Sequence, residues 1–192
     1  LHLAVAEGQR NSIGNLSCLL RSLDYHNSQP TEGWKVEILN IADVNGQTVL
    51  HVISAEVMIR VPLLKAYLKE ISKACNDQKT KLLMAKDSNN CTPFHLAAKG
   101  YESDSKNPTD EAQRRKCDER NAQSLSELVK ALDPQHLVKI MSQCNRQQQT
   151  VLHCAVRSGL NAMKTLITSL NSASLTPSGA IVALLSCGDE NG

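Results

Sequence analysis

The sequence predicts an all-α protein built from stacked helical repeats, and two observations lead to this fold class. A short phrase centred on a histidine returns four times along the 192 residues. Between the copies, apolar residues recur at intervals of three and four, as on one face of a helix, and no useful length of sequence alternates with period two. The four copies are Leu1-His2-Leu3-Ala4, Val49-Leu50-His51-Val52, Pro93-Phe94-His95-Leu96 and Val151-Leu152-His153-Cys154.

Each full repeat is expected to open with a turn that leads into a helix. Asn45-Gly46 suits a turn that needs positive φ, because both residue types accept that conformation cheaply. Thr48, Thr92 and Thr150 stand where a helix begins, so a hydroxyl there can satisfy an unpaired backbone N–H. Pro93 follows at the first helical position, where its missing donor costs nothing. The repeats start eight residues before the histidine, at Asp43, Asp87 and Asn145.

The whole phrase, Asp-x-Asn-Gly-x-Thr-x-Leu-His-x-Ala, resembles the opening of an ankyrin repeat. Thr92-Pro93-Phe94-His95-Leu96-Ala97-Ala98 nearly spells the family signature Thr-Pro-Leu-His-x-Ala-Ala. The stretch from Thr150 to Gly159 matches it except at the proline and one alanine. The resemblance covers essentially the whole chain apart from insertions. It implies an α-solenoid whose repeats each hold a β-turn and two antiparallel helices.

The spacing divides the chain into one array of unusually long repeats. The histidines at positions 2, 51, 95 and 153 are 49, 44 and 58 residues apart, whereas ankyrin repeats are about 33 residues long. The expected units are a partial repeat over 1–42, full repeats over 43–86, 87–144 and 145–188, and the start of another at 189–192. Because the chain begins and stops inside repeats, we expect it to be a piece of a longer protein.

An added short helix in each repeat and one polar insertion explain the extra length. Short apolar runs before the turns predict the added helices at 36–39, 81–84, 137–141 and 181–185. Helical spacing predicts longer helices at 13–23, 63–74, 125–132 and 163–170. The insertion, residues 102–121 of the third repeat, mixes six acidic with five basic residues. It is expected to be a solvated, mobile loop with some helix near its end.

Composition limits the classes of function. The net charge is +2, and Phe94 and Trp34 are the single Phe and Trp, so neither a basic field nor stacking platforms point to nucleic acid. No apolar run approaches the ~20 residues that a membrane span needs. The seven cysteines are odd in number and lack Cys-x-x-Cys spacing. They favour reduced thiols and an intracellular setting, either cytoplasmic or nuclear.

No catalytic residue, metal site or cofactor is predicted. Cys91 and His95 could place two zinc ligands on one helix face, and sets of cysteine, histidine and aspartate can be assembled around the repeated histidines. A histidine that recurs once per repeat is instead expected to hydrogen-bond the turn backbone between neighbouring repeats. No phosphate-binding glycine-rich loop, His-Glu-x-x-His or Gly-x-Ser-x-Gly motif is present.

The resemblance implies a protein-interaction module, a scaffold or adaptor without catalytic activity. Such a module binds other proteins through a concave face of turn tips and first helices, and neither a small-molecule substrate nor nucleic acid is expected there. The face is rich in amides and almost neutral, which suits hydrogen bonding rather than electrostatic capture. The residues expected on it are Val44, Asn45, Gln47, Ser88, Asn89, Asn90, Lys99, Arg146, Gln147, Gln148, Gln149, Arg157 and Ser158.

Two other classes of function stay open. The array could be the targeting or regulatory segment of a larger multidomain protein, such as an effector that an intracellular bacterium secretes into a host cell. It could also belong to an enzyme domain, which a unique polar cleft with strongly shifted pKa values would support.

Overall fold

The computed structural model describes residues 18, 34–55, 60–72, 75–99 and 111–172. These residues are mostly helical, which confirms the all-α class, and among them strand pairing is limited to an isolated antiparallel bridge between Cys144 and Thr150. The helices are α3 (Trp34–Leu39), α4 (Val49–Ala55), α5 (Arg60–Ile71), α6 (Asn76–Leu83), α7 (Pro93–Ala98), α8 (Glu111–Ala131), α9 (Pro134–Met141), α10 (Val151–Ser158) and α11 (Leu160–Ser172).

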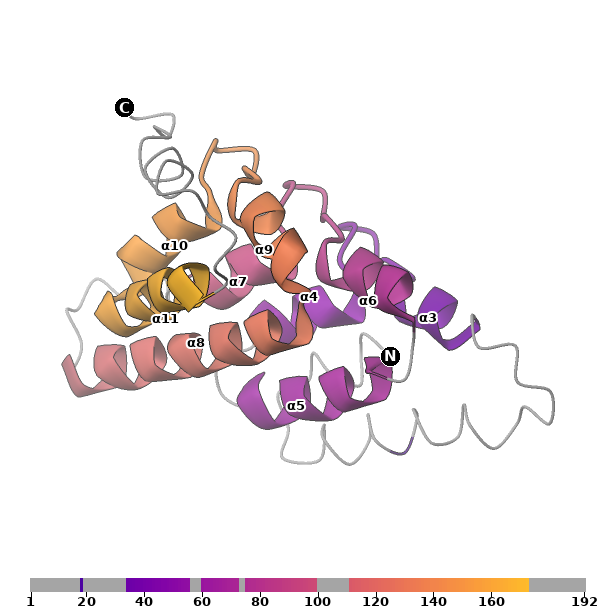
Figure 1. The fold of residues 1–192 in the computed structure, drawn as a ribbon, viewed down its shortest axis with the longest axis horizontal. Helices are drawn as coiled ribbons and strands as arrows, with labels where there is room; N and C mark the ends of the chain where they lie inside the picture. Colours follow the sequence, from indigo (N-terminus) through magenta and orange to yellow (C-terminus); the bar gives the residue numbers. More distant parts are fainter. Residues whose placement is uncertain (1–17, 19–33, 56–59, 73–74, 100–110, 173–192) are drawn as a thin grey trace.

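The helices follow one another in a fixed order: a short helix, a turn, an inner helix and an outer helix. The inner helices α4, α7 and α10 contact one another in succession, and the outer helices α5, α8 and α11 do the same. Figure 1 shows α8 running alongside α5 and α11. Each inner helix also contacts the outer helix that follows it. The described part of the chain is therefore a stack of helical units whose equivalent helices form rows.

The predicted elements that fall on described residues are present. The short helices expected at 36–39, 81–84 and 137–141 are α3, α6 and α9. The longer helices expected at 63–74 and 163–170 are α5 and α11. The helices predicted at 13–23 and 181–185 lie outside the described residues, and so does the turn expected at 189–192. Of the residues before 34, only Cys18 is described.

The core lies between the rows and uses the apolar positions spaced three and four apart. Tyr67, Leu64 and Ile71 turn one face of α5 inward, and Phe94 fills the space beneath α7, all fully or almost fully buried. Leu166 of α11 is also fully buried. Each such side chain contributes about 1.5–3 kcal/mol by leaving water. This burial between neighbours, rather than in one central globule, is what joins the units.

The polar insertion differs from expectation. Residues 111–121 are helical and continue without a break into the helix predicted at 125–132, forming the 21-residue α8; residues 102–110 lie outside the described residues. Helix near the end of the insertion was expected and is present, and residues 111–116 and 119 are exposed as a solvated segment should be. Cys117, Asp118 and Asn121 differ from this expectation, because they are buried. They lie on the same face as Leu125 and Leu128, which an apolar pattern alone does not reveal.

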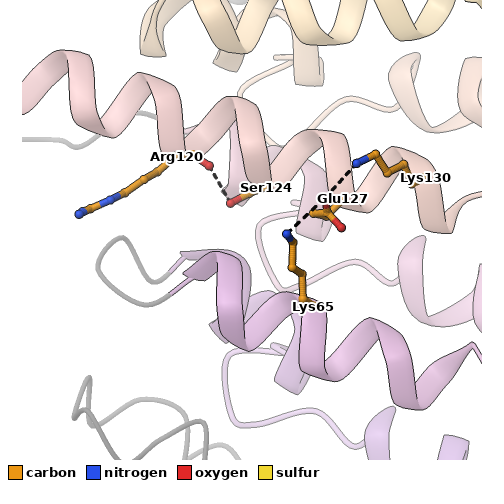
Figure 2. A network of polar contacts seen from close by, with 5 residues as sticks. All are labelled: Lys65, Arg120, Ser124, Glu127 and Lys130. Atoms are coloured by element: carbon orange, nitrogen blue, oxygen red, sulfur yellow. Dashed lines mark hydrogen bonds and ion pairs between the residues drawn. The ribbon is translucent and has the colours of Figure 1, made fainter.

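The outer surface between α5 and α8 carries a small group of charges (Figure 2). Glu127 of α8 lies 3.0 Å from Lys130 of the same helix and 3.9 Å from Lys65 of α5. Nearby, Ser124 Oγ donates to the Arg120 carbonyl at 2.9 Å. Lys65 is 59% exposed, so this ion pair adds little to stability. The apolar contacts beneath it hold the outer row together.

Candidate protein-interaction groove

Three turns, one before each inner helix, share the same hydrogen bonds. Asp43 Oδ1 accepts from the backbone N–H groups of Asn45 and Gln47, both at 2.8 Å, and the Asp43 N–H donates to the Gln47 carbonyl. Asp87 and Asn145 do the same for their own turns, at 2.8 and 2.9 Å. An aspartate or asparagine side chain that binds its own backbone in this way fixes the turn. The three tips are therefore rigid.

The fourth residue of each turn adopts positive φ. Gly46 has φ 71°, Asn90 has φ 57° and Gln148 has φ 56°. Glycine and asparagine tolerate this conformation, whereas glutamine does so at a cost. The turn expected from Asn45-Gly46 is thus repeated in the later units with less favourable residues.

Backbone hydrogen bonds join each turn to the next one. The Ser88 N–H donates to the Asn45 carbonyl and the Arg146 N–H donates to the Asn89 carbonyl, both at 2.9 Å. At Gly46 a β-carbon would lie 2.9 Å from the Ser88 nitrogen, so a glycine is needed there for space as well as for φ. The tips form a ladder along one edge of the stack.

The repeated histidines connect neighbouring units. The Nδ1 atoms of His51 and His95 accept from the Thr48 and Thr92 N–H groups at 3.1 and 3.2 Å. The proton therefore lies on Nε2, which in His51 donates to the Cys91 carbonyl at 3.0 Å. In His95 it reaches the carbonyls of Gln143 and Gln149, each at 3.1 Å.

Burial favours the neutral form of His51 and His95. Burial lowers the pKa of His95 to about 4, against the opposing effect of its hydrogen bonds to the Gln149 and Gln143 carbonyls. Burial likewise lowers the pKa of His51. His153 Nδ1 also accepts from the Thr150 N–H, at 3.2 Å. With both ring nitrogens of His51 and His95 engaged in backbone contacts, neither is placed to act as a base or to bind a metal ion.

A groove of about 640 Å³ lies beside the second and third of these turns. Turn residues form one side and the ends of the inner helices α7 and α10 form the other. Its lining consists of Gln47, Asp87, Asn89, Cys91, His95, Leu96, Lys99, Asn145, Arg146, Gln147, Gln149, Cys154 and Arg157. We call this the interaction groove.

The interaction groove brings together about half of the residues expected to bind a partner. Those that line it are Gln47, Asn89, Lys99, Arg146, Gln147, Gln149 and Arg157. Val44, Asn45, Ser88, Asn90 and Gln148 are exposed on the turns but do not line it. Gln149 was expected to present its side chain to a partner, but it is only 7% exposed. Its backbone N–H donates to Asn145 Oδ1.

Ser158 also has a structural contact. Its Oγ accepts from Nδ2 of Asn121, which lies 3.5 Å from the Lys99 carbonyl as well. Asn121 of α8 therefore ties the end of α7 to the end of α10, next to Arg157. Sequence reasoning placed Asn121 in a solvated loop and missed this role. The available signal was its position three residues after Asp118 and four before Leu125, on the buried face of one helix.

Cys91 and Cys154 line the groove, whereas the sequence suggested only that Cys91 could be one of two zinc ligands. Burial raises the pKa of Cys91, with repulsion from Asp87 adding to it. Burial raises the pKa of Cys154 to about 11, and the charges of Lys99 and Arg157 act in the opposite direction. Both thiols are therefore protonated near neutral pH and are weak nucleophiles. No cluster of three metal-ligating side chains occurs among the described residues.

The exposed charged side chains that line the groove are basic. Lys99, Arg146 and Arg157 are exposed along its rim. The single carboxylate in its lining, Asp87, is 6% exposed and turned toward its own backbone.

Comparisons with known proteins add no relative. No protein-family model matches the chain, and no curated protein matches it either. Within the described ranges, no helix is both long and apolar enough to cross a membrane.

Proposed function

We propose that this chain is a non-catalytic protein-interaction module built from ankyrin-type repeats, and that the interaction groove is its binding surface. The observation that carries the proposal is the groove itself: rigid turn tips and inner-helix ends converge on one hollow, and side chains such as Asn89, Gln147 and Arg157 face it without holding the fold together. Exposed polar groups on a rigid scaffold can specify a partner at little cost in stability.

The repeat architecture supports the ankyrin assignment. Each unit has a turn, an inner helix that starts after a threonine, an outer helix and a short helix. The buried histidine of one unit donates to carbonyls around the next turn. These are the roles that the resemblance implies for the threonine and the histidine of the phrase.

The state of the reactive side chains supports a binding role over catalysis. Enzymes place histidines and thiols in a cleft with pKa values suited to proton transfer or attack. Here His95 is held neutral by burial and both of its nitrogens are hydrogen-bonded, and Cys154 has a raised pKa. An intracellular setting, where thiols stay reduced, is part of the same proposal.

Site-specific photo-crosslinking tests the binding surface. A photoreactive phenylalanine analogue is placed at Asn89 or Gln147 in the groove, and at Lys69 or Lys164 on the outer helices as matched exposed controls. Irradiation in a cell lysate followed by mass spectrometry should give the same crosslinked protein from both groove positions and not from the outer ones. Crosslinks from the outer positions alone would move the surface away from the groove, and their absence at all four would contradict the interaction function.

A further inference from the structure

We propose that the interaction groove holds a short acidic segment of a partner polypeptide, with Arg146 and Arg157 binding its carboxylates. This deepens the function proposed above and rests on it. Arg146 lies in the third turn, Arg157 lies in the last turn of α10, and Lys99 is the C-cap of α7, so basic residues line the groove on both sides. Arginine is the cation best suited to carboxylates, because its planar fork binds both oxygens.

The lining of the groove does not neutralise Arg146 and Arg157. Asp87 is its single carboxylate, and Oδ1 of that residue already accepts two backbone N–H bonds of its own turn. Cys154 and Cys91 are protonated thiols near neutral pH, and His95 is neutral. The charge that faces the hollow is therefore positive although the chain as a whole is close to neutral.

Arg146 and Arg157 form no ion pair with another described residue. Other cations of the described chain do: Arg115 pairs with Glu111, and Lys130 pairs with Glu127. Unpaired arginines at the rim of a hollow attract anionic groups and steer their approach.

The remaining lining suits a polypeptide rather than a bare anion. The side chains of Asn89 and Gln147 can donate to and accept from a peptide backbone. Leu96 and Cys154 offer a small apolar floor. A volume of about 640 Å³ is in the range of ligand pockets and holds a few side chains, not a folded domain. The bond from Asn121 to Ser158 fixes the helix end that carries Arg157, so this cation is presented in a defined position.

The test is selection from a library. A random peptide library of about twelve residues, displayed on phage, is panned against the chain. The best peptide is then synthesised with a fluorescent label, and its Kd is measured by anisotropy at low and high NaCl. We expect enrichment of Asp and Glu over the starting library and weaker binding at high salt, as screening of charge pairs requires. The double variant Arg146→Glu, Arg157→Glu should weaken binding at least ~10-fold.

A matched control and a charge swap make the result specific. The double variant Lys69→Glu, Lys164→Glu changes the net charge by the same amount on the outer helices and should leave the Kd within about twofold. A peptide whose acidic residues are replaced by lysine should bind the Arg146→Glu, Arg157→Glu chain better than the original chain. Circular dichroism of every variant checks that the helices persist.

The outcomes distinguish the failure of this proposal from the failure of the proposed interaction function. Enriched peptides that are neutral or basic, or whose Kd ignores the groove reversal, overturn the acidic segment while leaving a protein-interaction module in place. The absence of both an enriched peptide and a crosslink at any of the four positions contradicts the interaction function as well. A labelled single-stranded RNA of about twenty nucleotides is measured in parallel. If it binds and loses affinity on the same reversal, the groove is assigned to nucleic acid and the acidic segment is withdrawn.

Discussion

The carboxyl group of Asp118 occupies the space that a β-carbon at Gly159 would need. From there Oδ2 accepts the Asn161 N–H and Oδ1 accepts the Ala162 N–H, both at 3.0 Å. A residue of α8 thus satisfies the unpaired N–H groups at the start of α11, as a cap from the helix itself ordinarily does. The outer helices of two neighbouring units are joined through this contact.

Replacing Asp118 by alanine should lower the free energy of unfolding by about 1–3 kcal/mol, because two buried N–H groups lose their acceptor. Urea unfolding followed by circular dichroism measures this. Glu119→Ala, an exposed change one residue away, should stay within about 0.5 kcal/mol of the parent. Equal effects of the two changes would mean that the Asp118 contact adds nothing to stability.

Gly159→Ala should destabilise the chain by about 1–3 kcal/mol, because the new methyl group overlaps the Asp118 carboxyl. The cost should be smaller when Asp118 is already alanine. A double-mutant cycle from urea unfolding therefore has a coupling energy of about 0.5–3 kcal/mol. Strict additivity would show that the two residues do not act on each other.

His95→Ala should destabilise the stack by about 2–4 kcal/mol. The change removes the acceptor of the Thr92 N–H and a donor to each of the Gln143 and Gln149 carbonyls, of which Gln149 keeps its bond from the Asn145 N–H. Each buried group left without a partner costs ~1–3 kcal/mol. His136, whose Nδ1 has no hydrogen-bond partner, provides the control, and His136→Ala should cost less than about 1 kcal/mol. Thermal and urea unfolding compare the two variants.

Stability should fall as the pH drops from about 6.5 to 4. The unfolded histidine has a pKa near 6.5 and folded His95 has a pKa of about 4, so in this window the unfolded chain binds more protons. The contribution of His95 is fully present above the unfolded pKa and is lost at up to ~1.4 kcal/mol per pH unit below it. His51 acts in the same direction because its pKa is also lowered.

Urea midpoints at several pH values across this window measure the effect. The slope should be shallower in His95→Asn, whose side chain does not titrate. If the parent and variant slopes coincide, the buried histidine is not the source of the dependence.

Gln148→Asn should stabilise the chain by about 0.5–1 kcal/mol. Gln148 has φ 56° and is exposed, while the equivalent turn positions hold Gly46 and Asn90, residue types that accept positive φ more readily. The neighbouring change Gln147→Asn serves as the control and should be neutral, since that residue does not have positive φ. The difference in Tm between the two variants decides the point.

The sequence was sufficient for the fold class, the turns and the role of the histidine. Each of these depends on local chemistry repeated at a readable spacing, such as an aspartate four residues before an N–H that it binds. His51 and His95 carry out the expected bonding to the turn backbone of the next unit. Several residues expected on the binding face, including Gln147 and Arg157, are also brought into one groove.

The roles of Asp118 and Asn121 could not be predicted in this way. Both are polar residues within a charged stretch, and their partners lie 43 and 37 residues further along the chain. Nothing in a single sequence indicates that a carboxylate will be buried against the end of another helix. The arrangement of charges in the groove could not be predicted either, because the sequence does not show that Asp87 is buried while Arg146 and Arg157 are exposed.

The hydrogen bonds between successive turns make the pitch of the array independent of the length of each unit. His51 and His95 are 44 residues apart and His95 and His153 are 58 apart, yet the bonds from Ser88 to Asn45 and from Arg146 to Asn89 have the same length, 2.9 Å. The additional residues of the longer unit do not separate the tips, because the hydrogen bonds between successive turns set the tip spacing along one edge of the stack. A change in the number of residues between two turns therefore leaves the spacing of the turn tips unchanged as long as the hydrogen bonds between the turns form.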